Sequence, residues 1–358
     1  MKIAKILIAV FLLTVIFPLP VRAEENHTVD GIYSFLPDSA KDRLDQNGLR
    51  GDWAEKLDTA GFFSLVASFF KEGFSSPLSA LCKTVSVLII ACLITSYSPE
   101  GKTGEAAQSV CAVSIALILA ADLYEIIAAA KEVLSGASIF MSGSVPLFAA
   151  VKAASGKPLS VSGGSAVLLF ACQALSYLCS FVLAPFMNSY LALGLCSSVG
   201  GKNTSSGIMD TVKKVTMWVL SLCVSVFLFI LSAKGIAGRN GDTLAMKTAK
   251  FLLGTTVPVV GGALSESASS VAASLSAMSG TAGMYIILGV LVIMLPLLCE
   301  LVCWRLALIL VRHLSVLFSA PVVNNLVEAL QGVISLLLGF SLLSLALLII
   351  STGVLISL

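Results

Sequence analysis

Charged residues are scarce in this chain of 358 residues, and their scarcity excludes an ordinary soluble protein. Asp, Glu, Lys and Arg make up 12% of the sequence, whereas 57% is hydrophobic and the mean hydropathy is +0.99. Soluble globular domains carry about 25% charged residues. The composition therefore predicts an all-α polytopic membrane protein, with six to eight transmembrane or re-entrant helices after a cleaved signal peptide.

Catalytic motifs are missing as well. The sequence has no HExxH, no Walker A lysine and no CxxC, and its two histidines are His27 and His313. A serine hydrolase would need a G-x-S-x-G turn for its nucleophile. Cys299 and Cys303 flank Glu300, but without a histidine or further ligands helix packing is favoured over a metal site. We expect no enzyme, no metal, no cofactor and no nucleic-acid partner.

Cysteine is absent from residues 24–77, although the whole chain has nine. This absence argues against a disulfide framework in that segment. The segment holds ten acidic and five basic residues, whereas residues 78–358 hold fourteen basic and ten acidic ones. This distribution predicts an acidic extracytoplasmic segment at 24–77, which includes an interfacial helix at 61–74, followed by a membrane domain at 78–358.

The first 23 residues have the pattern of a signal peptide. Lys2 and Lys5 precede a short apolar core, and Val21 and Ala23 are small residues suited to cleavage after Ala23. The alternative is an uncleaved first anchor. Cleavage is favoured because the apolar core is short for a membrane span of about 20 residues.

Apolar runs predict the membrane segments. They lie near 78–97, 106–130, 137–155, 164–197, 215–233, 251–279, 284–310 and 330–357. The run 137–155 contains Gly143 and Pro146, and the run 164–197 is too long for one upright helix, so it either tilts, breaks at Pro185 or forms a hairpin. The orientation follows from the basic loop at 234–250, which we place in the cytoplasm.

Three acidic residues within the apolar runs are candidate functional groups. Asp122 and Glu125 share a face of the predicted span at 106–130, and Glu300 lies in the span at 284–310. Charged groups are costly inside a bilayer, so they usually pair with one another or line a polar path. The alternative for Asp122 and Glu125 is a position at the membrane interface.

The run at 251–279 is interrupted in its middle. Pro258 lacks an amide hydrogen, and Gly261 and Gly262 add conformational freedom, so a helix is expected to break there. A segment of small residues follows, and it includes Ser265, Glu266 and Ser269. Transporters place broken helices of this kind along the transport pathway. The alternative, weighted equally, is a tightly packed structural hinge.

The stretch "DTLAMKTAKFLLGTTVPVVGGALSESASSV", from Asp242 to Val271, closely resembles the signature of the stage III sporulation protein AE family. The residues that carry the resemblance include Asp242, Lys247, Lys250 and Phe251, followed by the Pro-Val-Val-Gly-Gly run. The similarity extends to "FLFILSAKGIAG" before this stretch and to "LFSAPVVNNL" after it. The residues 24–130 carry the weakest similarity.

The resemblance implies a subunit of a channel, or feeding tube, between the mother cell and the forespore that sustains late forespore gene expression. It implies residence in the mother-cell membrane around the forespore. The implied partners are the stage III sporulation proteins AA to AH, which include an ATPase, and stage II sporulation protein Q. We expect Lys247 and Lys250 to face the cytoplasm and to meet either that ATPase or anionic lipid. The alternative function is a stand-alone secondary transporter of a small solute.

Overall fold

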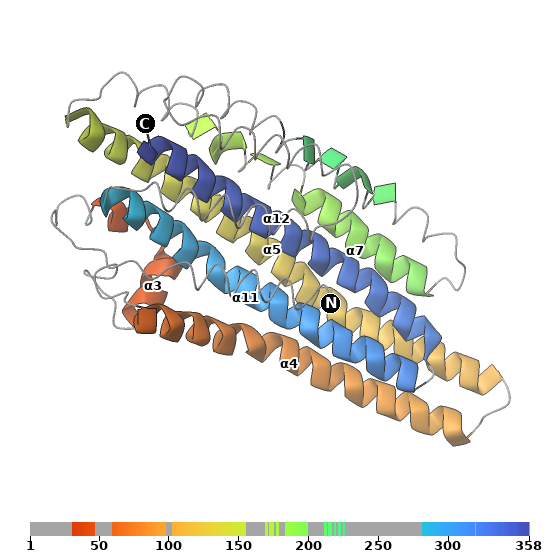
Figure 1. Ribbon diagram of the computed structural model, residues 1–358. Helices are drawn as coiled ribbons and strands as arrows, with labels where there is room; N and C mark the ends of the chain where they lie inside the picture. Colours follow the sequence, from red (N-terminus) through yellow and green to blue (C-terminus); the bar gives the residue numbers. More distant parts are fainter. Residues whose placement is uncertain are drawn as a thin grey trace.

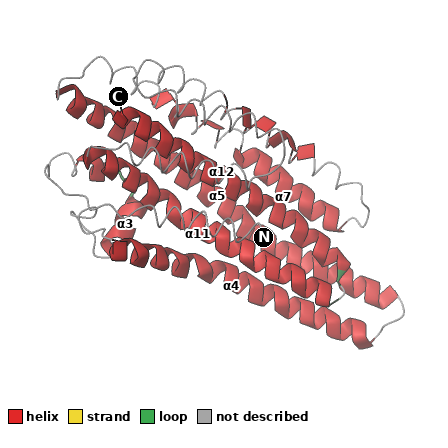
Figure 2. Ribbon diagram, in the orientation of Figure 1, coloured by secondary structure: helices red, strands yellow, loops and turns green. Residues whose placement is uncertain are grey.

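The computed structural model describes six stretches of the chain, which are 31–46, 59–97, 102–154, 183–199, 281–318 and 320–357, and short pieces between 169 and 225. Their regular structure is helical throughout, with no strand among the described residues (Figure 2). The six described helices are α3 (Asp38–Gln46), α4 (Thr59–Tyr97), α5 (Lys102–Ala154), α7 (Ala184–Val199), α11 (Thr281–Leu317) and α12 (Pro321–Ser357).

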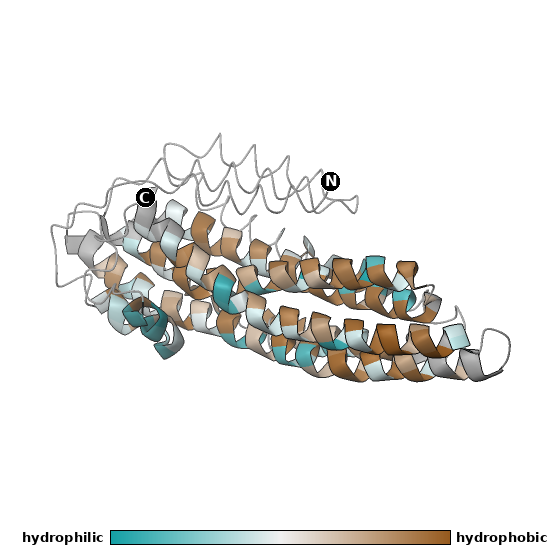
Figure 3. Cartoon of the chain, turned by 90° about the horizontal axis from the view of Figure 1, so that it is seen from below, coloured by the Kyte–Doolittle hydropathy of each residue, from teal (hydrophilic) through white to brown (hydrophobic). Residues whose placement is uncertain are grey.

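The long helices form an elongated bundle in which α11 has the central position (Figure 1). Helix α11 contacts α4, α5 and α12, while α12 also contacts α5 and α7. In the most apolar window of α11, 94% of the residues are buried, compared with 22% for α4. Figure 3 shows hydrophobic residues along the whole length of the bundle, whereas hydrophilic residues dominate the short α3.

Four of these helices are long and apolar enough to cross a membrane. The candidate spans are Ser64–Ile94, Ser109–Ala150, Tyr285–Leu317 and Val322–Gly353. The predicted runs at 284–310 and 330–357 therefore correspond to α11 and α12. The predicted run at 251–279 and the predicted signal peptide at 1–23 lie outside the described residues. The total of six to eight membrane segments stays a prediction.

Helix α5 corrects the prediction of two separate spans at 106–130 and 137–155. It is one continuous helix of 53 residues, or about 80 Å at 1.5 Å per residue, well beyond the roughly 30 Å of a hydrocarbon core. The charged pair between the two runs, Lys131 and Glu132, is exposed and stays helical, because a preceding run of alanines favours the helix. Pro146 is exposed and does not end the helix.

Helix α4 likewise joins two elements that the sequence analysis separated. The predicted interfacial helix at 61–74 and the predicted span at 78–97 lie in one helix of 39 residues that contains Pro77. Proline removes one backbone hydrogen bond and causes a kink rather than an end when the flanking turns are well packed. Pro77 is buried, and the helix continues on both sides of it.

Helices α11 and α12 form an antiparallel hairpin with a short connection. Helix α11 ends at Leu317, and Pro321 begins α12, which is the first-turn position that proline favours. The amide of Ala320 donates to the carbonyl of Ser315 at 2.9 Å, and the amide of Asn324 donates to the carbonyl of Ala320 at 3.1 Å. This connection fixes the register in which side chains from the two helices meet.

Candidate functional site

The residues of the predicted broken helix and of the family motif lie outside the described residues. They are Pro258, Gly261, Gly262, Ser265, Glu266 and Ser269 in the broken helix, and Asp242, Lys247, Lys250 and Phe251 in the motif. The candidate site described below is therefore built from the predicted intramembrane residues Glu300, Asp122 and Glu125 and from their surroundings.

Glu300 lies near the middle of the central helix α11, where α11 contacts α4. It is partly buried, and the residues on either side of it, Cys299 and Leu301, are fully buried. Gly73 of α4 faces it: a Cβ atom at Gly73 would lie 3.0 Å from Glu300 Cα and 3.1 Å from its backbone nitrogen. Because glycine has no side chain, the two helix backbones meet at Glu300.

A basic side chain from α3 lies next to this contact. Arg43 Nε is 3.9 Å from Glu72 Oε2, and both side chains are partly exposed, at 33% and 49%. The positive charge of Arg43 also acts on Glu300. We call these four residues, Arg43, Glu72, Gly73 and Glu300, the Glu300 junction. It joins α3, α4 and α11 through the Arg43–Glu72 ion pair and the Gly73–Glu300 backbone contact.

One turn further along α11, polar side chains connect α11 to α12. Arg305 donates to the hydroxyl of Ser335, and Ser335 donates to the carbonyl of Gln331 at 2.5 Å. Gln331 Nε2 donates in turn to the carbonyl of Leu308 at 3.0 Å. These bonds partner part of the polar groups inside an otherwise apolar hairpin, where unpaired polar groups are costly; Arg305 Nε has no partner among the described residues.

Arg312 forms an ion pair near the turn of the same hairpin. Its Nη2 atom is 3.1 Å from Glu328 Oε2, with side-chain exposures of 40% and 59%. The two bases of α11 that follow Glu300, Arg305 and Arg312, meet Ser335 and Glu328 of α12. The base near Glu300 comes from the N-terminal segment.

Asp122 and Glu125 lie on α5, away from the Glu300 junction. Asp122 is partly exposed and Glu125 is exposed. Lys83 of α4 is the opposite charge that acts on Asp122, and Glu125 is a nearby like charge. The structure thus places these two acids at the outer side of the α4–α5 pair and does not bring them together with Glu300.

Several buried polar atoms have no hydrogen-bond partner among the described residues. They include Trp304 Nε1 on α11, the hydroxyls of Ser341 and Ser344 on α12, and those of Ser142 and Ser144 on α5. Trp304, Ser144, Ser341 and Ser344 have no exposed surface. Buried polar groups are usually paired with protein or water. With Asn188 Oδ1 on α7, such atoms without a partner among the described residues occur on four helices, α5, α7, α11 and α12.

The chemistry available at this site is that of ion pairing and hydrogen bonding. The described residues contain no group of three or more His, Cys, Asp or Glu side chains that could hold a metal ion.

Sequence reasoning missed Arg43, Glu72 and Gly73, because all three lie in the segment 24–77, which was predicted to be extracytoplasmic. The Gly73–Glu300 contact joins residues 227 positions apart, and the sequence contains no local signal for it.

Comparison with known proteins places these helices in a family. The model of the family "Stage III sporulation protein AE" matches residues 45–357. A relative, the stage III sporulation protein AE of Bacillus subtilis (strain 168), is 21% identical over 264 residues, which cover 72% of this chain and 64% of the relative. The chain thus aligns with just under two thirds of that relative's length. No solved structure matches the chain.

Proposed function

The chain belongs to the stage III sporulation protein AE family, and from this premise we propose that it is a membrane subunit of a channel complex between the mother cell and the forespore. The observation that carries the proposal is the extent of the family match, residues 45–357. This match includes the whole of α4, α5, α7, α11 and α12. The relation to the family therefore rests on the helical bundle and not on one short motif.

The proposed location is the mother-cell membrane that surrounds the forespore. Four helices that could cross a membrane support a multi-pass protein. The proposed partners are the stage III sporulation proteins AA to AH and stage II sporulation protein Q. The basic residues Lys247 and Lys250 are the proposed contact to an ATPase partner, because a basic cytoplasmic loop attracts acidic protein surfaces or anionic lipid.

The proposed transport role rests on polar groups inside the bundle. Glu300 and Arg305 interrupt the most buried apolar helix of the described chain, where ionisable residues usually mark a functional path. We propose that Glu300 contributes to a permease-like pathway together with the broken-helix residues Pro258, Gly261, Gly262, Ser265, Glu266 and Ser269. Asp122 and Glu125, on the outer side of α4–α5, belong to the periphery of this pathway.

A clean deletion in the spore-forming host tests the proposal. We expect engulfment to be completed and a late forespore reporter to remain silent, and we expect the intact coding sequence to restore the reporter. Normal reporter activity and normal spores in the deletion strain would contradict the channel role. Uptake of a solute by vesicles that contain the purified chain alone would instead favour a stand-alone secondary transporter.

Point variants distinguish a transport pathway at 258–276 from a passive scaffold, in which these residues would matter only through stability. Glu266→Gln removes one charge, and Gly262→Leu fills the expected break, so both should reduce reporter activity at normal protein levels. If both variants accumulate normally and sporulate like the parent, the broken helix is not part of a pathway. The protein level is measured in the same cells by immunoblotting.

A further inference from the structure

The N-terminal described segment, residues 31–46, packs against the bundle along one apolar face. Ile32, Leu36, Ala40 and Leu44 follow one another at intervals of four residues, and none is more than 2% exposed. All four belong to the same hydrophobic core as the long helices. In Figure 1, α3 lies beside the end of the bundle at which α4 and α11 begin. We call residues 31–46 the N-terminal strap.

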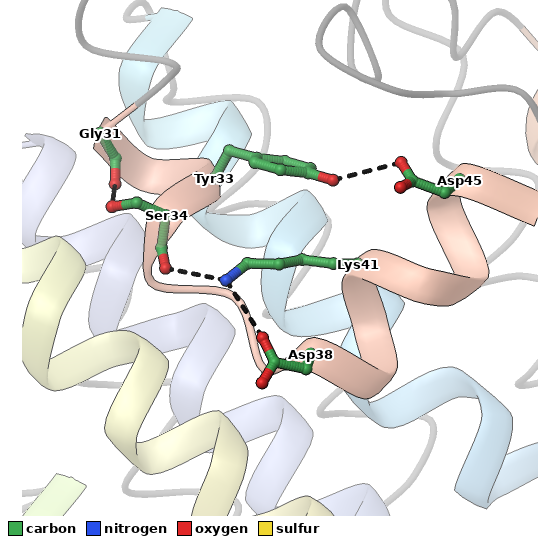
Figure 4. Close-up of polar contacts among 6 residues, drawn as sticks. All are labelled: Gly31, Tyr33, Ser34, Asp38, Lys41 and Asp45. Carbon is green, nitrogen blue, oxygen red and sulfur yellow. Dashed lines mark hydrogen bonds and ion pairs between the residues drawn. The ribbon is translucent and has the colours of Figure 1, made fainter.

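The polar groups of the strap bond to one another (Figure 4). Lys41 Nζ donates to the carbonyl of Ser34 at 3.1 Å and lies 3.5 Å from Asp38 Oδ1. Tyr33 donates its hydroxyl to Asp45 Oδ1 at 3.4 Å. These contacts join the first helical turn of the strap to α3, so that the strap folds into a compact unit.

Glycines on α5 provide the surface on which the strap lies. A Cβ atom at Gly136 would lie 3.3 Å from Pro37 Cγ and 4.0 Å from Pro37 Cβ, and a Cβ atom at Gly143 would overlap the ring of Phe35. The side chain of Leu147 fits equally closely over Gly31. The strap therefore has a defined register on α5 rather than a loose apolar contact.

The charged end of the strap lies beside α4 at the Glu300 junction. Arg43 lies 3.9 Å from Glu72, and Glu72 precedes the glycine at which α4 touches the backbone of Glu300. The guanidinium group of the strap is thus paired with a carboxylate of α4, next to the contact of α4 with α11. Arginine suits this position because its guanidinium group stays charged and offers several N–H donors to a carboxylate.

We propose that the N-terminal strap is a latch that closes the Glu300 junction, with Arg43 fastening it through Glu72. Apolar burial and the α5 glycines set the position of the strap, and Arg43 secures its charged end. This inference concerns the fold of the chain itself and does not depend on the proposed channel role.

A disulfide between the strap and α5 reports the docked state. The pair Pro37→Cys and Gly136→Cys has a Cβ–Cβ distance of 4.0 Å, within the range of about 3.5–4.5 Å that disulfides require. The native chain has no cysteine before Cys82. A protease site is also inserted between residues 47 and 58. Cleavage of the full-length protein in membranes then separates the strap fragment from the rest of the chain, unless the disulfide joins the two.

We expect retention of the strap fragment in the double variant under non-reducing conditions, and release in both single variants. On this background, Arg43→Gln should slow disulfide formation about two- to fivefold, the range for one partly exposed ion pair. Arg43→Glu should slow it further, and the exchange Arg43→Glu with Glu72→Arg should restore the rate. Lys71→Gln is the matched control, because it removes an exposed positive charge beside Glu72 and should leave the rate unchanged.

Two results would overturn the latch. The first is failure of the double variant to form the disulfide although it accumulates in the membrane, which would mean that the strap does not dock on α5. The second is an equal rate in Arg43→Glu and in Lys71→Gln, which would mean that Arg43 does not fasten the strap. Neither readout uses sporulation, so the latch and the proposed function are tested separately.

Discussion

Helices α4 and α11 are both apolar enough to cross a membrane, yet they occupy opposite environments in the bundle. The most apolar window of α11 is 94% buried, and that of α4 is 22% buried. Ile90, Leu93 and Ile94 of α4 are each at least 45% exposed, as expected for side chains that face lipid or a partner subunit. Hydrophobicity therefore identifies the two spans but does not distinguish the central helix from the peripheral one.

The comparison also explains where ionisable residues are tolerated. On α4, Lys71, Glu72 and Lys83 are all exposed and can reach water, headgroups or a neighbouring charge. On α11, Glu300 and Arg305 are partly buried; Arg305 donates to Ser335 of α12, and Glu300 lies at the contact with Gly73 of α4. A charge on a peripheral helix is thus weak evidence of function, whereas a charge on the central helix requires partners and marks a candidate site.

The largest effect on stability is expected from a larger side chain at Gly289, where α11 meets α5. A Cβ atom at Gly289 would overlap the ring of Phe140, which is fully buried. Gly289→Leu should lower the free energy of unfolding by about 1–3 kcal/mol or more, because overpacked cores must shift their backbones. Thermal unfolding in detergent measures the effect. Ile90→Leu on exposed α4 is the control, and an equal loss there would contradict the central role of α11.

Alanine substitutions at two glycines of α12 should have intermediate effects on stability, of opposite sign. A Cβ atom at Gly332 would lie 2.6 Å from the hydroxyl oxygen of Tyr190 on α7, whereas nothing lies within 4 Å of one at Gly339. Gly332→Ala should destabilise the protein by about 1 kcal/mol, and Gly339→Ala should stabilise it by about 0.4–1 kcal/mol. The same unfolding assay compares them, and the same sign for both would show that α7 does not pack there.

A smaller effect is expected from buried hydroxyl groups with and without a partner. Ser138 donates to the carbonyl of Cys172 at 2.5 Å, whereas the Ser341 hydroxyl has no partner among the described residues. Ser138→Ala should cost about 1 kcal/mol of stability, and Ser341→Ala should be neutral or stabilising. A cost for Ser341→Ala as large as that for Ser138→Ala would reveal a partner of this hydroxyl outside the described residues.

The smallest effect is expected at the exposed end of the α11–α12 hairpin. Arg312 and Glu328 form an ion pair with side-chain exposures of 40% and 59%. Arg312→Gln should change the free energy of unfolding by no more than about 1 kcal/mol, because water and salt screen such pairs. Raising the salt concentration should reduce the difference from the parent. A difference that persists at high salt would place this pair in a less polar environment.

The sequence predicted the spans best where a clear turn separates two helices. The hairpin at Leu317 to Pro321 has a proline at a helix start, and the predicted runs on either side, 284–310 and 330–357, correspond to α11 and α12. The runs in α4 and α5 were divided at Pro77 and at Lys131–Glu132, because a proline or a charged pair usually marks a boundary. In both helices the helix continues through the predicted boundary, because Pro77 is buried by packing and Lys131 and Glu132 are exposed at the surface.

The site was predictable only in part, for a physical reason. Glu300 is identifiable from sequence because a carboxylate in an apolar run is costly. Its surroundings are not, because Arg43 and Gly73 reach it through tertiary packing that no local pattern records. The family signature lies at 242–271, outside the described residues, so its proposed pathway residues stay predictions.

The most direct measurement of the central claim is late forespore reporter activity in a strain whose only copy carries Glu300→Gln. This change keeps the size of the side chain and removes its charge. Arg312→Gln is the control, since its ion pair lies at the exposed end of the same helix. At equal protein levels, the account predicts a silent or strongly reduced reporter for Glu300→Gln and normal activity for Arg312→Gln. Normal activity in both strains would contradict a functional role for the carboxylate in the central helix.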